Sequence, residues 1–216
     1  MSRILHSSLA VLAALFTLSA CFNAETTLTF NADETVTSKS ALILDKELVA
    51  LSEMESNEPA FCIEPNEIRE DHPKGVSCAM VETRSLASLL DGAQVISFGG
   101  QMMEDGQEET DMLYTVSRQN DGSYIVSFDL SDLKEAADEQ ATGGEEMDDE
   151  EMQQIIAMVK ALFIDSGFAI RVSAPTIIST NGEMVDANTA EYRFAIADMF
   201  DDLKVPNSFD VTVKLN

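Results

Sequence analysis

Residues 111–130 read DMLYTVSRQNDGSYIVSFDL and contain the clearest fold signal in the chain. Two β-prone runs, Met112 to Ser117 and Tyr124 to Phe128, flank the tetrad Gln119-Asn120-Asp121-Gly122. An Asp-Gly pair accepts positive φ angles at low cost, so it is typical of the turn in a β-hairpin. This stretch therefore predicts two antiparallel strands joined by a tight turn.

Strand patterns also occur on both sides of this hairpin. Alternating or β-prone runs occupy 25–30, 95–98, 168–173, 177–179, 190–196 and 209–215. Alternation of apolar and polar residues is typical of strands with one buried face. Because strands that follow one another through tight turns pair antiparallel, we expect an antiparallel sheet.

Helical periodicity appears in four segments, at 40–54 (with Ser40 as its cap), 83–90, 131–140 and 147–163. The last has the cleanest apolar stripe: Met152, Ile155, Ile156, Val159, Leu162 and Phe163. Amphipathic helices must bury their apolar face against another layer. The predicted fold class is therefore α+β, an antiparallel β-sheet covered on one face by amphipathic helices. The long helix at about 147–163 would cross the sheet and could enclose an apolar cavity.

The amino-terminal segment has the features of a targeting signal. Arg3 is its only charge before residue 25, and residues 9–18 are almost wholly apolar. This core is shorter than the ~20 residues that span a bilayer, so it fits a signal peptide. It ends in Leu18-Ser19-Ala20-Cys21, the pattern of a bacterial lipobox. We expect a lipoprotein signal peptide at 1–20, a lipid on the Cys21 sulfur and a single extracytoplasmic domain at 21–216. The alternative is an ordinary secreted protein with a chance cysteine.

The lipobox predicts a location in the bacterial cell envelope. Acyl chains on Cys21 would anchor the protein stably to a membrane. Phe22 follows the cysteine, where an aspartate favours inner-membrane retention in enteric bacteria. In a host with two membranes we therefore expect the outer membrane, with the domain facing the periplasm.

Cys62 and Cys78 remain once Cys21 carries the lipid. Outside the cytoplasm two such thiols usually pair, and closing a loop of roughly 15 residues contributes about 3 kcal/mol to stability. A redox-active or metal-binding pair is the alternative, but the spacing is far from Cys-x-x-Cys. We predict a structural disulfide and no metal site.

Composition and missing motifs exclude several functions. The net charge of −26 would repel nucleic acid and anionic lipid head groups. His72 is the single histidine after cleavage, and we expect it in an exposed loop. The chain has no Gly-x-Ser-x-Gly, phosphate-loop or dinucleotide motif. We predict that the protein is not an enzyme and binds no cofactor.

Two acidic runs and the methionines allow more than one interpretation. Residues 145–151 precede the stripe of the long helix, where carboxylates stabilise a helix start; calcium binding is the alternative. The run 104–111 also lacks the calcium-loop register. The eleven methionines favour core filling, with an adaptable lipid pocket or a copper site as alternatives.

Residues 174–182, APTIISTNG, and 188–194, NTAEYRF, resemble the LppM-type bacterial lipoprotein domain family. That family tends to show a strand, a proline, a Ser-x-Asn-Gly turn and an Asn-Thr pair opening the next strand. The resemblance implies an α+β envelope protein without known enzymatic activity, and some members are associated with lipid-containing ligands. It assigns no functional residues here, because the matching positions explain a hairpin.

These features predict a lipid-anchored, non-enzymatic binding or interaction module. Its partners would be the membrane, through the amino-terminal lipid, and an apolar or lipid-like ligand or an envelope protein. The first alternative is a structural or assembly factor that binds envelope proteins through its acidic surface. The second is a hydrolase with an unrecognised site.

Overall fold

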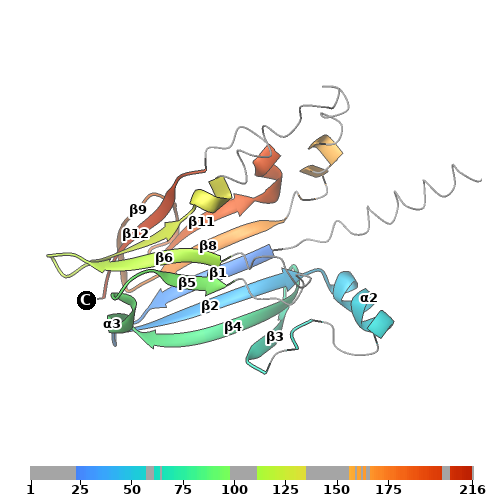
Figure 1. The fold of residues 1–216 in the computed structure, drawn as a ribbon, viewed down its shortest axis with the longest axis horizontal. Coiled ribbons are helices and arrows are strands. Elements are labelled where there is room, and N and C mark those ends of the chain that lie inside the picture. Colours follow the sequence, from blue (N-terminus) through green and yellow to red (C-terminus); the bar gives the residue numbers. More distant parts are fainter. Residues whose placement is uncertain are drawn as a thin grey trace, which may run out of the picture.

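A computed structural model provides the structure. It describes residues 23–56, 61–63, 65–97, 111–134, 156–158, 160–161, 163, 166–200 and 205–215. Most of these residues lie in twelve strands, which form two sheets (Figure 1).

The larger sheet has seven strands in the order β10-β11-β8-β1-β2-β4-β3. Their bounds are β1 (Asn23–Phe30), β2 (Thr35–Leu44), β3 (Glu67–His72), β4 (Gly75–Ser85), β8 (Gly167–Ser173), β10 (Glu183–Asp186) and β11 (Thr189–Ala195). Neighbours pair antiparallel except β1 and β8, which run parallel. The sheet is therefore mixed.

The smaller sheet has five antiparallel strands in the order β5-β6-β7-β12-β9. Their bounds are β5 (Gln94–Ser97), β6 (Asp111–Arg118), β7 (Tyr124–Asp129), β9 (Thr176–Thr180) and β12 (Ser208–Lys214). Three short helical elements also belong to the fold: α2 (Lys46–Ser56), α3 (Leu86–Leu89) and the 3-10 helix η1 (Ile196–Phe200).

One apolar core joins the two sheets. It includes Leu28 and Phe30 from β1 and Phe128 and Phe209 from β7 and β12, each at most 1% exposed. Rings continue this core from Tyr114 through Phe128 to Phe209, with centroids 5.6 and 5.7 Å apart. Aromatic pairs at such distances stabilise a core beyond the area they bury. The space between the sheets is thus filled by side chains.

The predicted hairpin is confirmed. β6 and β7 pair antiparallel, with Arg118 opposite Tyr124. Gly122 adopts a φ of 81°, the positive value for which the Asp-Gly turn was expected. Asp121 Oδ1 accepts hydrogen bonds from the Ser123 amide at 3.0 Å and hydroxyl at 2.6 Å, which closes the turn.

The predicted fold class, a single antiparallel sheet covered on one face by amphipathic helices, is wrong. The described residues form two sheets, each covering the inner face of the other. Alternation along a strand indicates that one face is buried, but it does not indicate which layer covers that face. The parallel pairing of β1 and β8 joins segments about 145 residues apart, so sequence patterns within either segment do not predict it.

The long helix predicted at 147–163 is not the layer over the sheet. Residues 156–158 and 160–161 are helical, and most of the remaining range lies outside the described residues. The space between the two sheets is filled by the packed core. The helix expected at 131–140 is described over 131–134 only.

Two other predicted helices begin later than expected. Residues 40–44 continue strand β2, and the helix starts at Lys46, where Asp45 Oδ1 accepts from the Glu47 amide at 2.7 Å. Residues 83–85 likewise belong to β4, and α3 begins after Ser85, whose hydroxyl caps it. In both places the sequence pattern predicted a helix, but main-chain pairing between β2 and β4 stabilises the strand conformation instead.

Candidate functional site

The residues singled out in the sequence are spread over the molecule. Cys21 and the acidic run 145–151 lie outside the described residues, as do 104–110. His72 ends strand β3 and is half-buried, with its Nδ1 accepting from the Lys74 amide at 3.2 Å. The expectation of an exposed loop for His72 is therefore wrong, because β3 continues to this residue.

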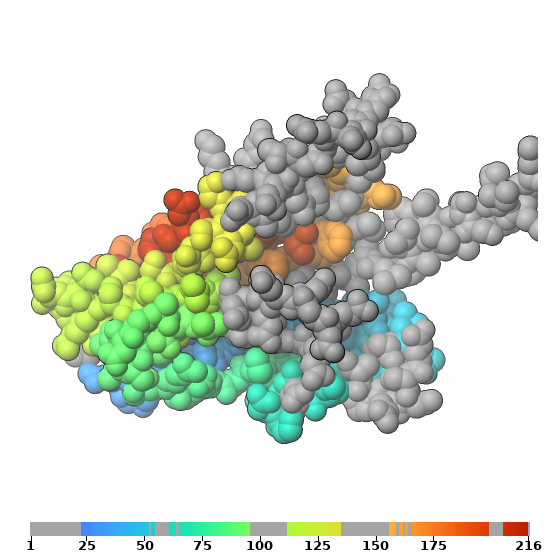
Figure 2. All heavy atoms as spheres, in the orientation of Figure 1, coloured from blue at the N-terminus to red at the C-terminus, as the bar shows by residue number. Residues whose placement is uncertain are grey.

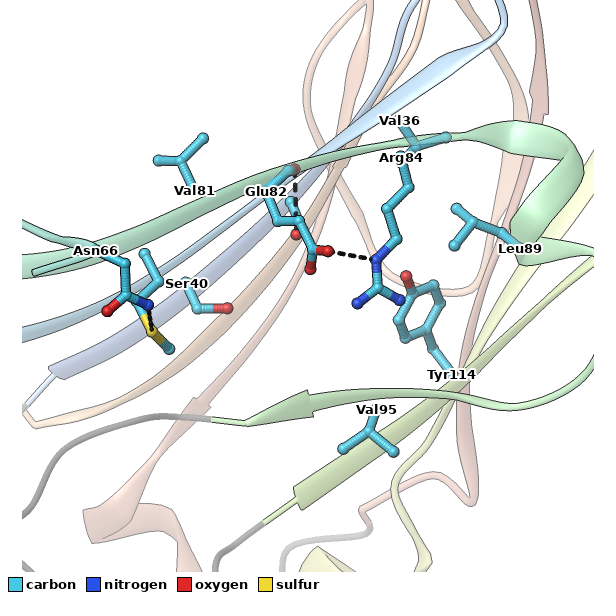
Figure 3. Close-up of a pocket in the computed structure, with 11 residues that line it drawn as sticks. Val36, Ser40, Asn66, Val81, Glu82, Arg84, Leu89, Val95 and Tyr114 are labelled. Carbon is cyan, nitrogen blue, oxygen red and sulfur yellow. Dashed lines mark hydrogen bonds and ion pairs between the residues drawn. The ribbon is translucent and has the colours of Figure 1, made fainter.

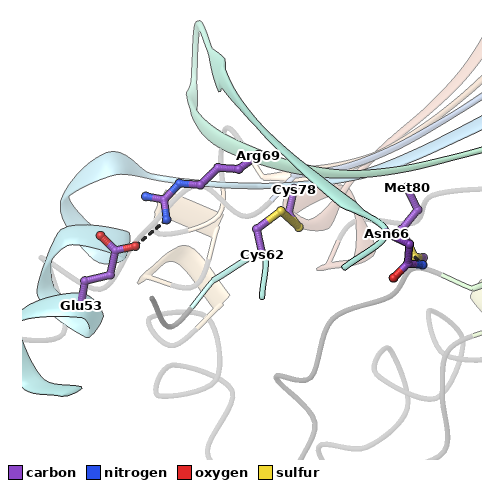
Figure 4. Close-up of a disulfide and its surroundings, with 6 residues drawn as sticks. All are labelled: Glu53, Cys62, Asn66, Arg69, Cys78 and Met80. Atoms are coloured by element: carbon purple, nitrogen blue, oxygen red, sulfur yellow. Dashed lines mark hydrogen bonds and ion pairs between the residues drawn. A yellow bond between two sulfur atoms is a disulfide. The ribbon is translucent and has the colours of Figure 1, made fainter. Parts of the chain in front are cut away.

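Cys62 and Cys78 form the predicted disulfide, with their Cα atoms 5.3 Å apart (Figure 4). It links the segment before β3 to β4 and belongs to a small second core with Leu44, Val49 and Phe61. Arg69 forms an ion pair with Glu53 beside it, joining β3 to α2. The segment between the two cysteines was expected to be a loop, but it contains strand β3, which pairs with β4.

One close group of possible metal ligands occurs in the described part of the chain: Cys62, Glu67 and Cys78. Both sulfurs are in the disulfide and cannot act as thiolates. A single carboxylate then remains, which is too few ligands for a metal site.

A cleft of about 370 Å³ opens where an edge of each sheet meets the other (Figure 3). Its lining comes from β2, β4, β5, β6, α3 and the residue before β3: Val36, Ser38, Ser40, Asn66, Met80, Val81, Glu82, Arg84, Leu89, Val95 and Tyr114. Figure 2 shows this side of the molecule as spheres, with α3 and β5 in green beside β6 in yellow-green, the neighbour of β5 in the smaller sheet. The volume lies at the small end of the range of about 300–1,000 Å³ found for ligand pockets.

Arg84 is the cationic group of this cleft. Its Nε donates to Glu82 Oε1 at 2.7 Å, and its Nη1 donates to Gln94 Oε1 at 3.2 Å. The bond to Glu82 is the main cause that raises the pKa of Arg84, so the guanidinium stays charged. These bonds hold the planar group between β4 and β5, across the mouth of the cleft.

Tyr114 forms the floor next to Arg84 (Figure 3). Its residue is 5% exposed, and burial raises the pKa of the phenol by disfavouring the charged form; the nearby Arg84 opposes this shift. The hydroxyl is therefore protonated at neutral pH and can donate a hydrogen bond into the cleft. Its ring stacks on Phe128, which ties the floor to the core.

Two apolar side chains stand exposed at the rim of the cleft. Val81 is 47% exposed and Val95 is 51% exposed, and they come from opposite sheets. Within the described chain, β5 pairs only with β6, and residues 81–85 of β4 pair only with β2. Both rims of the cleft are therefore strand edges, and the side chains of Val81 and Val95 point away from Arg84 and Tyr114 (Figure 3).

Sequence reasoning missed this site. Val81, Glu82 and Arg84 lie in and beside a stretch interpreted as the start of a helix, and Val95 was assigned only to a strand. The alternation in GVSCAMVETRS was the available signal for β4, but the meeting of β4 with β5 is a tertiary contact.

The fold and the cleft together define a two-sheet β domain with an open, mixed apolar and polar cleft at its edge. No known protein family matches the chain, and no curated protein sequence does. Among solved structures, the NMR structure of the folded domain of Mycobacterium tuberculosis LppM is similar, with 12% identity over 88% of each chain and a TM-score of 0.42. At that TM-score the likeness defines neither fold nor function for this chain.

The described helices are all too short or too polar to span a membrane. The predicted anchor residue Cys21 and the predicted signal peptide precede the first described residue, Asn23.

Proposed function

We propose that this chain is a lipid-anchored bacterial envelope lipoprotein whose two-sheet domain acts as a non-enzymatic binding module. The lipobox at 18–21 supports the anchor, and the cleft supports the binding role. The ligand would be amphipathic: an apolar segment against Met80 and Leu89, which line the cleft, and a polar end at Arg84 and Tyr114.

The combination of apolar and hydrogen-bonding side chains in one cleft is the observation that carries this proposal. Met80 lies on the same face of β4 as Arg84 and is partly exposed, so covering its side chain with an apolar ligand removes apolar surface from water. Arg84 is charged and Tyr114 is protonated, so both donate hydrogen bonds to the same acceptor-bearing end. The interior is packed, so the ligand would lie in the edge cleft and not between the sheets.

The binding half is tested with cis-parinaric acid, a fluorescent fatty acid, and the full mature chain, residues 21–216. We expect saturable binding, and at least tenfold weaker binding for Met80→Asp. Met184→Asp is the matched control, because Met184 is also a solvent-accessible methionine on a strand and lies on β10, outside the cleft lining. Equal binding by both variants, or no binding to the parent protein, would refute the cleft as the ligand site.

An acidic-surface assembly factor is the second candidate, and it is favoured by the net charge of −26. In that case, binding of an envelope protein partner should weaken strongly when the salt concentration rises from about 50 to about 500 mM, because salt screens exposed charges. Binding at the apolar cleft would depend far less on salt, so one salt series separates the two candidates.

A further inference from the structure

A second pocket, of about 140 Å³, lies at the end of the seven-stranded sheet where β1 begins. Figure 1 shows this end as the right-hand start of the blue strand. The starts of β1 and β8, the end of β11 and Lys74 line the pocket. Asn23, at its edge, is two residues after Cys21. The pocket is separate from the edge cleft, with which it shares no lining residue.

Asn23 carries a buried donor without an acceptor. The residue is 5% exposed, and its Nδ2 has no hydrogen-bond partner. Its Oδ1 accepts from Lys74 Nζ at 3.3 Å, which fixes the amide orientation, because a flipped amide would point its N–H groups at an ammonium. Buried polar groups are nearly always paired, so this N–H group indicates an acceptor supplied from outside the described chain.

The charges around the pocket favour an anion. Lys74 and Arg193 line it, and Arg171 lies behind it, bonded to Glu25 at 2.8 Å and Glu191 at 2.6 Å. Glu25 and Glu191 are both paired with arginines, in a chain whose net charge is −26. Glu25 also lines the pocket, but its Oε2 is occupied by Arg171. A cation and an amide donor are what an oxyanion binds.

We propose that this pocket binds the phosphate of a phospholipid head group beside the anchor. The choice of source rests on the proposed lipidation: two residues of chain span at most about 7 Å, so a lipid on Cys21 would hold Asn23 at head-group level. The surface as a whole would be repelled by an anionic membrane. A local cationic pocket at the anchored end would set which face of the domain meets the bilayer.

The experiment uses residues 21–216 with Cys21→Ser, so that no acyl chain contributes. The side-chain amide of Asn23 is followed by NMR while two probes are titrated at constant ionic strength. One is inorganic phosphate, and the other is dihexanoyl-phosphatidylethanolamine below its micelle concentration. We expect saturable shifts of the Asn23 amide with both, because both present phosphate oxygens.

Two variants test the residues. Lys74→Gln should weaken binding at least fivefold, whereas Lys39→Gln removes the same charge from a lysine paired with Glu70 and should change nothing. Asn23→Asp keeps the shape, replaces the donor by a carboxylate and should abolish binding. Because this variant lacks the reporting side-chain amide, its binding is read from the backbone amides of Ala24 and Gly167, which line the pocket. Retention of the dispersed amide spectrum shows that a variant is folded.

The outcomes are distinct. No saturable shift with either probe, or equal weakening by Lys74→Gln and Lys39→Gln, overturns the oxyanion site. A shift with inorganic phosphate but not with the phospholipid overturns the head-group source. The assay involves neither the edge cleft nor an acyl chain on Cys21, so its result does not depend on the proposed function. If Cys21 carried no lipid, a phosphate-dependent shift of the Asn23 amide would still establish the oxyanion site.

Discussion

Arg171 on β8 should be the most important charged residue for stability among the described ion pairs. Its Nη1 donates to Glu25 Oε2 on β1 at 2.8 Å, and its Nε donates to Glu191 Oε2 on β11 at 2.6 Å. It therefore ties the parallel neighbour and the antiparallel neighbour of β8 together. The side chains of the three residues are 26%, 24% and 11% exposed, so water screens them only in part.

The substitution Arg171→Met keeps an apolar stem and removes both bonds. A hydrogen bond to a charged group contributes about 1.5–3 kcal/mol, so two contribute about 3–6 kcal/mol before screening. Partial exposure reduces this by about half, giving an expected loss of about 1.5–3 kcal/mol in the free energy of unfolding. Two facing carboxylates would also remain without their shared partner.

The assay is urea unfolding followed by circular dichroism at pH 7, with the disulfide intact. Lys39→Met is the control, because Lys39 and Glu70 also bond at 2.8 Å but are 45% and 48% exposed. That pair should contribute at most about 0.5 kcal/mol. Adding Glu191→Gln to Arg171→Met should restore part of the loss by removing one of the facing charges. A loss below about 1 kcal/mol, or one equal to that of Lys39→Met, would refute the reasoning.

Four further predictions concern the anchor, the disulfide, a close contact and acid stability. Cys21→Ala should abolish incorporation of labelled palmitate, whereas Cys62→Ser should retain it; incorporation into both, or into neither the parent nor the variants, would contradict the lipobox. Reducing the disulfide, whose cysteines are 16 residues apart, should cost about 3 kcal/mol in urea unfolding. Gly75→Ala should lower the melting temperature, since a Cβ there would lie 1.9 Å from the Leu44 carbonyl oxygen and the backbone must move. Burial alone would raise the pKa of Glu191, but hydrogen bonds from its arginine partners outweigh it and lower the pKa. Its stabilising effect is therefore present above its ordinary value of 4.5 and lost as pH falls through the lowered pKa, so Glu191→Gln should reduce the acid-induced part of the stability loss in a pH series.

Strands and turns were predictable where the signal is local. The hairpin at 111–130 was confirmed because its turn residues and flanking alternation act over a few residues. Strands near 25–30, 168–173 and 209–215 were confirmed for the same reason, since every second side chain faces one core. The helices expected from 40 and 83 began several residues late, because pairing between β2 and β4 extends both strands.

The candidate site could not be predicted, because its parts come from separate elements. Arg84 and Val95 are near each other in sequence but belong to different sheets, and Tyr114 comes from a third strand. Asn23 meets Lys74 only because β1 and the β3–β4 turn reach the same end of the sheet. No periodicity in one segment encodes such meetings.

The amino-acid sequence alone determined the lipobox signal, the negative net charge, the first strand, most of the strands after residue 90 and the pairing of Cys62 with Cys78. Each of these depends on neighbouring residues, on composition or on the number of cysteines. The tertiary structure alone decided that a second sheet covers the first, that β1 runs parallel to β8, and where the two pockets lie. A buried face can be covered by any apolar layer of matching shape, so the choice between helix and sheet depends on packing across the whole chain.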